Sequence, residues 1–348
     1  MPTSAVRVIA SKLVFFLLVL ASFVPFAFTQ GSWSVVKTFP IAGAGAWDYV
    51  TFDSDNHRLY VPRTTDTMVI DADSGKVIAD IPGQKRAHGV ALVPKVGRGF
   101  ISDGGGNGAV LVFDLKTNAV LGTIAAQPDA DGVIYDKNSD RVLVVSGDGG
   151  VLMTLKPDVA LPDGKIEQTI ELGGAPEFLA ADPTGKVYIN LMDKNTVAVV
   201  DLKQAKVVSR WPVAPGGAPV GMSIDPEKHR IFIGCRNPQK LIIMSTDDGK
   251  ILASLPIGSG VDATKFDGAQ IFASCGDGKL HVVQETPSGG FDMVQTIQTP
   301  AGARTMDIDR STSTIYLPTA EFEPSKPGTR PSPKPDTFKI VVVRKSSS

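Results

Sequence analysis

Residues 57–83 read HRLYVPRTTDTMVIDADSGKVIADIPG, and their pattern recurs along the chain. The apolar residues fall in short β-branched runs that end at Pro, Asp or Gly, which is typical of strands joined by tight turns. Related stretches occupy 97–124, 185–213 and 229–257, while no long segment with helical periodicity occurs beyond residue 30. The chain is therefore predicted to be all-β and built from repeats.

The repeat has a period of about 43 residues. The position that ends the first strand of each predicted unit recurs at intervals of 41, 42, 46, 43, 42 and 42 residues. Seven four-stranded units at this spacing predict a seven-bladed β-propeller, in which each blade buries its faces against its neighbours. The recurring positions are Asp53, Pro94, Asp136, Asp182, Asp225, Asp267 and Asp309.

The two ends of the mature chain are expected to close the ring. The seventh unit stops after a third strand at 338–343, and residues 344–348 form a polar tail. Residues 33–43 read WSVVKTFPIAG and are similar to the fourth strand of another unit, such as GKVIADIPG. Pairing this strand into the last blade would leave no free sheet edge. We therefore expect one seven-bladed propeller over residues 30–343, closed by the N-terminal strand of the mature chain.

Residues 1–29 are typical of a secretory signal peptide. Arg7 and Lys12 precede an apolar run at 13–24, and a small-residue pattern follows at 27–29. The run is shorter than the roughly 20 residues that a membrane-spanning helix needs. We therefore expect cleavage, no membrane span afterwards, and a secreted or periplasmic protein that works without nucleotides.

Composition excludes several other classes of protein. With 43% hydrophobic and 20% charged residues among 348, the chain is too apolar to be disordered. Without Arg7 and Lys12 it has 33 basic and 36 acidic residues, net −3, which argues against general nucleic-acid binding. No Cys-x-x-Cys-His motif occurs, so covalent haem is excluded, and we expect a monomer. Cys235 and Cys275 end equivalent strands, and either a disulfide or two buried thiols would fit this pattern.

The stretch RLYVPRTTDTMVIDADSGKV at 58–77 resembles the YVTN-type repeat of YncE-like seven-bladed propellers, and the resemblance extends over 32–343. It implies an exported binding or interaction scaffold. One relative is associated with single-stranded DNA, but this chain lacks the basic aromatic stripe for that contact. More distant seven-bladed relatives include lactonases and lyases, so a metal-assisted hydrolase or lyase with its active site at the central channel is the alternative.

Polar side chains just before the recurring positions are expected to meet at the mouth of the central channel. Clustered carboxylates repel one another, so a bound cation, a shared proton or the charge of Arg304 would relieve the repulsion. Carboxylate ligands favour Ca²⁺ or Mg²⁺, whereas His88 would admit a transition metal, and an acid beside it could act as a general base. Alternatively, these side chains only accept backbone hydrogen bonds from the adjacent blade. The candidate ligand-binding residues, for an unidentified small molecule or protein, are Asp48, His88, Asp131, Glu177, Asp262 and Arg304; the candidate ligands of a divalent cation are Asp48, Asp131, Glu177 and Asp262.

The loops between second and third strands add polar residues on the same face. Most are expected to be solvated turn residues, because Asp and Gly favour tight turns whatever the function. The last of these loops, at 321–337, contains five prolines and three cations, and is either a lid over the mouth or a solvated extension. The loop residues are Arg63, Asp103, Asp148, Asp193, Arg236, Asp277 and Glu321.

Overall fold

The computed structural model describes residues 1–3, 31–324 and 331–346. Within these ranges the regular structure consists of strands and two short 3₁₀ helices, η1 (Pro94–Val96) and η2 (Met192–Lys194). None of the helices in the described ranges has the length and hydropathy to span a bilayer. Most of the expected signal peptide, residues 4–29, lies outside the described residues.

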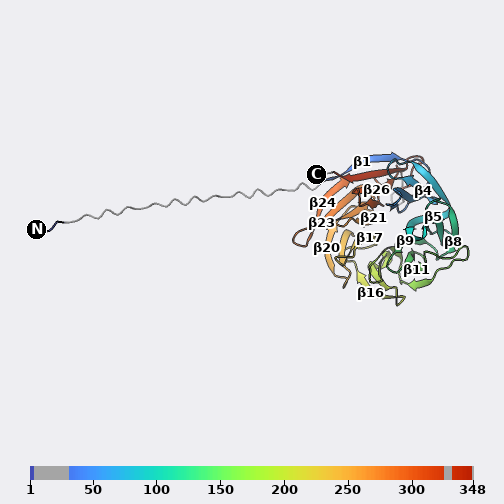
Figure 1. The fold of residues 1–348 in the computed structure, drawn as a ribbon, viewed down its shortest axis with the longest axis horizontal. Coiled ribbons are helices and arrows are strands. Elements are labelled where there is room, and N and C mark those ends of the chain that lie inside the picture. The colour runs from blue at the N-terminus through green and yellow to red at the C-terminus, as the bar shows by residue number, and fades with distance from the viewer. Residues whose placement is uncertain (4–30, 325–330, 347–348) are drawn as a thin grey trace.

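Six antiparallel sheets are arranged around a common centre, five with four strands and one with seven (Figure 1). The seven-stranded sheet contains β2 (Thr51–Asp53), β3 (Arg58–Pro62), β4 (Thr64–Asp71), β5 (Val77–Val93), β6 (Arg98–Asp103), β7 (Ala109–Asp114) and β8 (Val120–Ala125). The next two sheets contain β9 (Ala130–Asp136), β10 (Arg141–Ser146), β11 (Val151–Leu155) and β12 (Gln168–Glu171), and then β13 (Pro176–Ala181), β14 (Lys186–Leu191), β15 (Thr196–Asp201) and β16 (Lys206–Pro212).

Two further sheets follow in chain order, and the last sheet combines both ends of the chain. The first two contain β17 (Pro219–Asp225), β18 (Arg230–Arg236), β19 (Gln239–Ser245) and β20 (Ile251–Pro256), and then β21 (Val261–Phe266), β22 (Gln270–Cys275), β23 (Lys279–Glu285) and β24 (Phe291–Gln298). The last contains β25 (Asp307–Asp309), β26 (Thr314–Thr319), β27 (Lys339–Lys345) and β1 (Trp33–Pro40).

The seven-stranded sheet arises because β5 is one continuous strand of 17 residues. From Val77 to Ala87 it pairs with β4, and from Ala87 to Val93 it pairs with β6. The outer strand of the first predicted unit therefore runs without a break into the inner strand of the second.

Burial explains why the strands differ in sequence. The middle strands, such as β6 and β14, are almost wholly buried because neighbouring sheets cover both of their faces. The outer strand β16 instead alternates between half-buried and exposed residues. The recurring Asp residues hold turns: the Asp53 carboxylate accepts from the backbone N–H groups of Asp55 and Asn56 at 3.1 and 3.3 Å.

The N-terminal strand completes the last sheet, which confirms the expected pairing. β1 runs antiparallel to β27, with Trp33 opposite Lys345 and Phe39 opposite Ile340. The strand β27 reaches Lys345, so the first two residues of the expected polar tail belong to the sheet. The backbone N–H of Ser346 donates to the carbonyl of Ser32 at 2.9 Å, which extends the contact beyond the strand.

The two cysteines are buried free thiols and form no disulfide. Cys235 packs with Val213 and Ile242, whereas Cys275 packs in a different apolar cluster with Phe232 and Leu241. Burial raises the pKa of both thiols to about 12. Both therefore act as small apolar side chains in the core.

Candidate functional site

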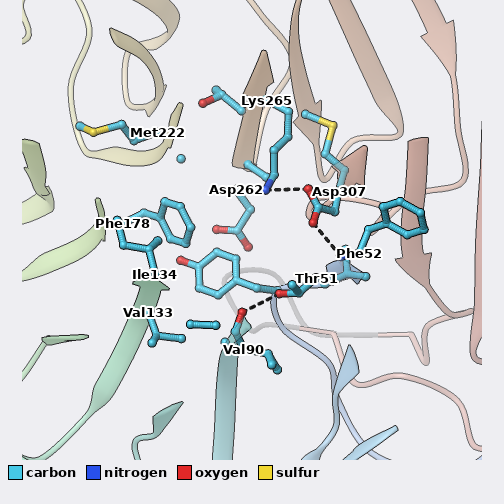
Figure 2. A pocket seen from close by; sticks show the side chains of 18 of the residues that line it. Thr51, Phe52, Val90, Val133, Ile134, Phe178, Met222, Asp262, Lys265 and Asp307 are labelled. Atoms are coloured by element: carbon cyan, nitrogen blue, oxygen red, sulfur yellow. Dashed lines mark hydrogen bonds and ion pairs between the residues drawn. The ribbon is translucent and has the colours of Figure 1, made fainter. Parts of the chain in front are cut away.

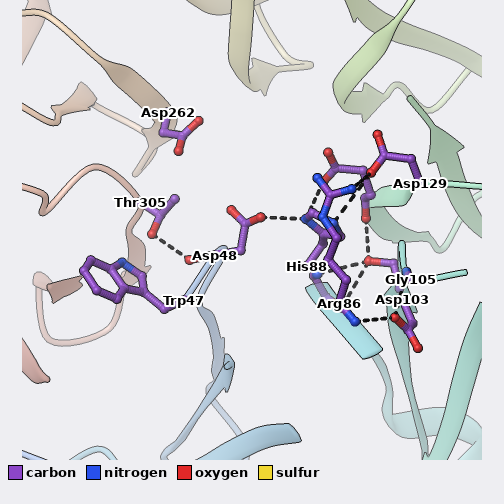
Figure 3. Close-up of polar contacts among 12 residues, drawn as sticks. Trp47, Asp48, Arg86, His88, Asp103, Gly105, Asp129, Asp262 and Thr305 are labelled. Carbon is purple, nitrogen blue, oxygen red and sulfur yellow. Dashed lines mark hydrogen bonds and ion pairs between the residues drawn. The ribbon is translucent and has the colours of Figure 1, made fainter. Parts of the chain in front are cut away.

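A cavity of about 1220 Å³ opens where the sequence places the channel mouth. Three sheets contribute charged residues to its wall: Asp48 before β2 and His88 on β5 in the seven-stranded sheet, Arg236 at the end of β18, and Arg304 before β25. The backbone of Asp48 is fixed on two sides, because its carbonyl accepts from Thr305 Oγ1 at 2.8 Å and its N–H donates to the carbonyl of Pro62 at 3.3 Å (Figure 3). The loop that carries Asp48 is thus held by the last sheet.

His88 lies among three carboxylates. Its side chain is 8% exposed, its Nδ1 is 2.6 Å from Asp48 Oδ2 and 3.4 Å from Asp131 Oδ1, and its Nε2 is 3.8 Å from Asp129 Oδ1 (Figure 3). Burial alone would lower the pKa of His88, but the hydrogen bond to Asp48 and the charges of Asp131 and Asp48 outweigh it and raise the pKa to about 9. His88 therefore carries a positive charge at neutral pH, and this charge relieves the repulsion between the acids.

The environment of Asp131 favours its neutral, protonated form, whereas that of His88 favours its charged form. Burial, together with the charges of Asp48 and Glu177, raises its pKa well above the ordinary range, against the influence of His88. Neither Asp131 Oδ1 nor His88 Nε2 has a hydrogen-bond partner among the described residues, although both atoms are buried. Asp48, His88 and Asp131 each offer one ligand atom, and these three atoms lie within 4.8 Å of one another. Among the described residues, this trio is the group whose ligand atoms lie close enough together to hold a divalent metal.

Asp262 lies outside this trio and is paired with arginines. It is 5% exposed, its Oδ2 accepts from Arg304 Nε at 2.5 Å, and its Oδ1 accepts from Arg236 Nη2. Two guanidinium groups from different sheets therefore share one buried carboxylate. The expected ring of carboxylates is divided into separate ionic groups.

Glu177 is half-buried, and its carboxylate has no hydrogen-bond or ion-pair partner among the described residues. Burial raises the pKa of Glu177 to about 7, with the charges of Asp262 and Asp48 adding to the effect and that of Arg236 opposing it. At neutral pH this carboxyl group exchanges readily between its two protonation states, so it has the pKa of a general acid or base.

Replacing Glu177 with glutamine should stabilise the protein at pH 8. The folded-state pKa is raised from 4.5 to about 7, so the folded state favours the protonated form and stability falls as the pH rises from 4.5 through about 7. A neutral glutamine removes this loss, with an expected gain at pH 8 of about 1 to 2 kcal/mol. Urea unfolding from pH 4.5 to 8 measures it, with the exposed Glu171→Gln as control. Equal slopes against pH in Glu177→Gln and the parent would contradict the prediction.

A second cavity of about 300 Å³ lies further along the inner strands (Figure 2). Tyr49 and Phe178, whose ring centroids are 4.8 Å apart, line it together with Met222 and Met306. Burial and the charges of Asp131, Asp48, Asp262 and Glu177 raise the pKa of Tyr49 well above its ordinary value, so its hydroxyl remains protonated. The channel thus changes from a charged mouth to a mainly apolar interior.

Two loop residues expected to be solvated are instead buried. Arg63 is 2% exposed, and its guanidinium donates to the carbonyls of Ala44 and Ala46 at 2.8 and 3.1 Å while lying 3.7 Å from the centre of the Phe338 ring. It therefore holds the loop that leads into Asp48. Arg63 departs from the general expectation because the loop folds over its side chain, and turn propensity contains no information about such coverage.

Asp103 is the second such residue, at 5% exposure. Its carboxylate accepts from the backbone N–H groups of Lys85 and Arg86 at 2.9 and 2.7 Å, three and two residues before His88. Asp193 and Asp277 in later loops accept from Ala175 and Ser259 in the same way. The recurrence of Asp in these loops is the sequence signal that could have indicated this role, which the sequence argument considered only for the residues of the mouth.

Several residues of the site were not predicted from the spacing of the repeats. Trp47, Arg86 and Phe322 line the mouth cavity, and Asp129 contacts Arg86 at 2.8 Å, yet none lies at the repeat position used to select candidates. In the loop 321–337, residues 325–330 lie outside the described ranges. Phe322 forms a β-bridge with Pro333, and both residues belong to the cavity wall.

Comparison with known proteins bears on the fold alone. No family model and no curated protein matches the chain, so membership of the YncE-like family is not confirmed. The structure is similar to Kuenenia stuttgartiensis hydrazine synthase, with a TM-score of 0.68 and 12% identity over 80% of this chain and 93% of that chain. With the ring of antiparallel sheets, this similarity defines a β-propeller-like fold. Because 1631 chains of solved structures resemble this one, the fold does not select a function, which has to be argued from the site.

Proposed function

We propose that the protein is an exported, seven-bladed β-propeller of the YncE-like type that serves as a binding scaffold and takes a small polar molecule at the channel mouth. The blade count is supported by the seven-stranded sheet, because β5 changes its partner from β4 to β6 at Ala87 and so divides this sheet into two four-stranded units. Export is supported by the sequence of residues 1–29.

One observation carries the binding function: a cavity of about 1220 Å³ in which charged side chains from separate sheets converge. Ligand sites in proteins are concave and contain a few polar groups in fixed positions, with volumes of roughly 300 to 1,000 Å³, so this cavity is slightly larger than most. Here Asp48 fixes His88, and Asp262 fixes Arg236 and Arg304. Such groups lose little conformational entropy when a ligand binds.

Ligand-observed NMR with a set of small polar compounds tests this function. Ala301 is exposed and lines the cavity, so Ala301→Trp should obstruct the mouth without disturbing the core. Ala119 is exposed in the turn between β7 and β8, and Ala119→Trp is the matched control. We expect compounds that bind the parent and the control but lose about tenfold or more in affinity to Ala301→Trp. If no compound distinguishes the two variants, the proposed function is wrong.

The metal-assisted hydrolase or lyase is the second candidate, favoured by the trio of Asp48, His88 and Asp131. Two carboxylates and one imidazole suit a divalent transition metal, and Glu177 would be the base. Elemental analysis of the purified protein tests this candidate. It predicts about one divalent metal per chain, lost in Asp131→Asn, and a melting temperature that falls with chelator. Protein that takes up no metal from a Zn²⁺ or Mn²⁺ solution would refute it.

A further inference from the structure

The charges around Asp262 do not balance. This single carboxylate, 7% exposed at its side chain, is shared by Arg236 and Arg304, one guanidinium on each oxygen. Arginine stays protonated at any physiological pH. The group Arg236–Asp262–Arg304, called the arginine pair below, therefore carries one excess positive charge. Both arginines line the mouth cavity.

The arginine pair also retains unused hydrogen-bond donors. Arg236 uses Nε on the carbonyl of Val261 at 3.0 Å and Nη2 on Asp262. Arg304 uses Nε on Asp262 and Nη2 on the carbonyl of Trp47 at 3.5 Å. Neither Nη1 has a hydrogen-bond partner within the ranges that the structure describes. Two guanidinium groups with free N–H donors, held by one carboxylate, suit the recognition of a second carboxylate.

The other cationic groups of the cavity wall already contact carboxylates of their own. Arg86 pairs with Asp129 at 2.8 Å, and His88 pairs with Asp48 at 2.6 Å. The described residues of the cavity wall thus include one carboxylate, Asp48, and four cationic groups. Asp131 contacts His88, and the charge of Glu177 acts on Arg236, but neither acid is part of the wall. The acidic ring expected from the sequence would have favoured a cation.

Aromatic side chains lie beside the arginine pair. Trp47 is 4% exposed and lines the cavity, and its ring is 5.8 Å from the Arg304 guanidinium and 5.9 Å from Phe322. The indole Nε1 of Trp47 is buried and has no hydrogen-bond partner among the described residues. This wall offers an apolar surface next to an anion-binding group.

We propose that the arginine pair binds the carboxylate of a small organic anion, whose apolar body packs against Trp47 and Phe322. This inference rests on the proposed function, because it names the ligand class for the same mouth cavity. It assigns Arg236 and Arg304 as the residues that contact the ligand, and Asp262 as the residue that positions them.

Benzoate is the probe, with benzamide as a neutral isostere and benzylamine as a cation. The chain has three tryptophans, so three indole N–H signals report on binding by ¹⁵N NMR, and Trp47→Phe identifies that of Trp47. We expect benzoate to shift the Trp47 signal and benzamide to leave it unchanged. The Kd for benzoate should rise about tenfold or more in Arg304→Gln and in Arg236→Gln, and less than twofold in Arg141→Gln, whose guanidinium donates to Glu167 at 3.1 Å and does not line the cavity.

Arg304→Lys protects the test against a simple folding defect. It keeps the positive charge beside Asp262, so it should retain more of the benzoate affinity than Arg304→Gln does, a graded recovery that misfolding does not mimic. Two results would refute carboxylate binding by the arginine pair: benzylamine binds and benzoate does not, or benzoate has equal affinity for the parent and Arg304→Gln. Neither result contradicts the proposed function of the mouth cavity. If Ala301→Trp also fails to affect any compound, both proposals fall.

Discussion

His88→Leu should lower the free energy of unfolding by about 3 to 5 kcal/mol at neutral pH, because a buried ion pair loses one partner. The variant leaves Asp48 and Asp131 facing each other without the imidazolium that lies 2.6 and 3.4 Å from their oxygens. Urea unfolding at pH 7, with chelator present, measures the loss. The matched control is His281→Leu, since His281 is equally buried at 6% exposed but burial lowers its pKa.

His88 should also make the free energy of unfolding depend on pH in the alkaline range. The pKa of His88 rises from 6.5 to about 9 on folding, so its stabilisation is complete below pH 6.5 and is lost as the pH rises through about 9. The expected loss is about 3 kcal/mol. A Glu177→Gln background removes the separate change below pH 7. In that background, stability should fall more steeply between pH 6.5 and 9.5 in the protein that keeps His88, and in its His281→Leu variant, than in the His88→Leu variant. A flat profile in the presence of His88 would show that the imidazole is neutral in the fold.

Trp33→Ala should lower the free energy of unfolding by about 3 to 5 kcal/mol, as is usual when a buried aromatic side chain is replaced by alanine. Trp33 is 2% exposed, packs edge-on against Phe272 at 4.9 Å, and donates from Nε1 to Gln270 Oε1 at 2.9 Å. It thus joins the closing strand β1 to the preceding sheet. Loss of this contact frees β1 and exposes the edge of β27.

Val36→Ala is the control for the closing strand, because Val36 lies on β1 and is 53% exposed. We expect it to change stability by less than about 0.5 kcal/mol. Equilibrium urea unfolding of both variants compares them directly. If Trp33→Ala and Val36→Ala unfold at the same urea concentration, the N-terminal strand does not contribute to the stability of the ring.

The repeat could be predicted because its causes are local. Alternating and β-branched runs define strands, and Asp53 and Asp136 hold turns through hydrogen bonds to residues two or three positions away. The pairing of residues 33–40 with the last sheet was predictable for the same reason, since the unfinished last unit lacks one strand. What this local pattern missed was the continuity of β5, which merges two units into one sheet.

For the site, spacing along the chain identified Asp48, His88, Asp131 and Arg304, since regular repeats bring equivalent positions together. Only the tertiary structure decided the pairing: His88 with the first two acids, and Asp262 with two arginines. These contacts join residues about 25 to 45 positions apart, most of them on different sheets, and each depends on side-chain geometry and loss of water, which no local pattern encodes. The sequence by itself therefore determined most of the charged groups that meet at the mouth, while the fold added Arg86 and Asp129 and determined which of these groups pair with one another.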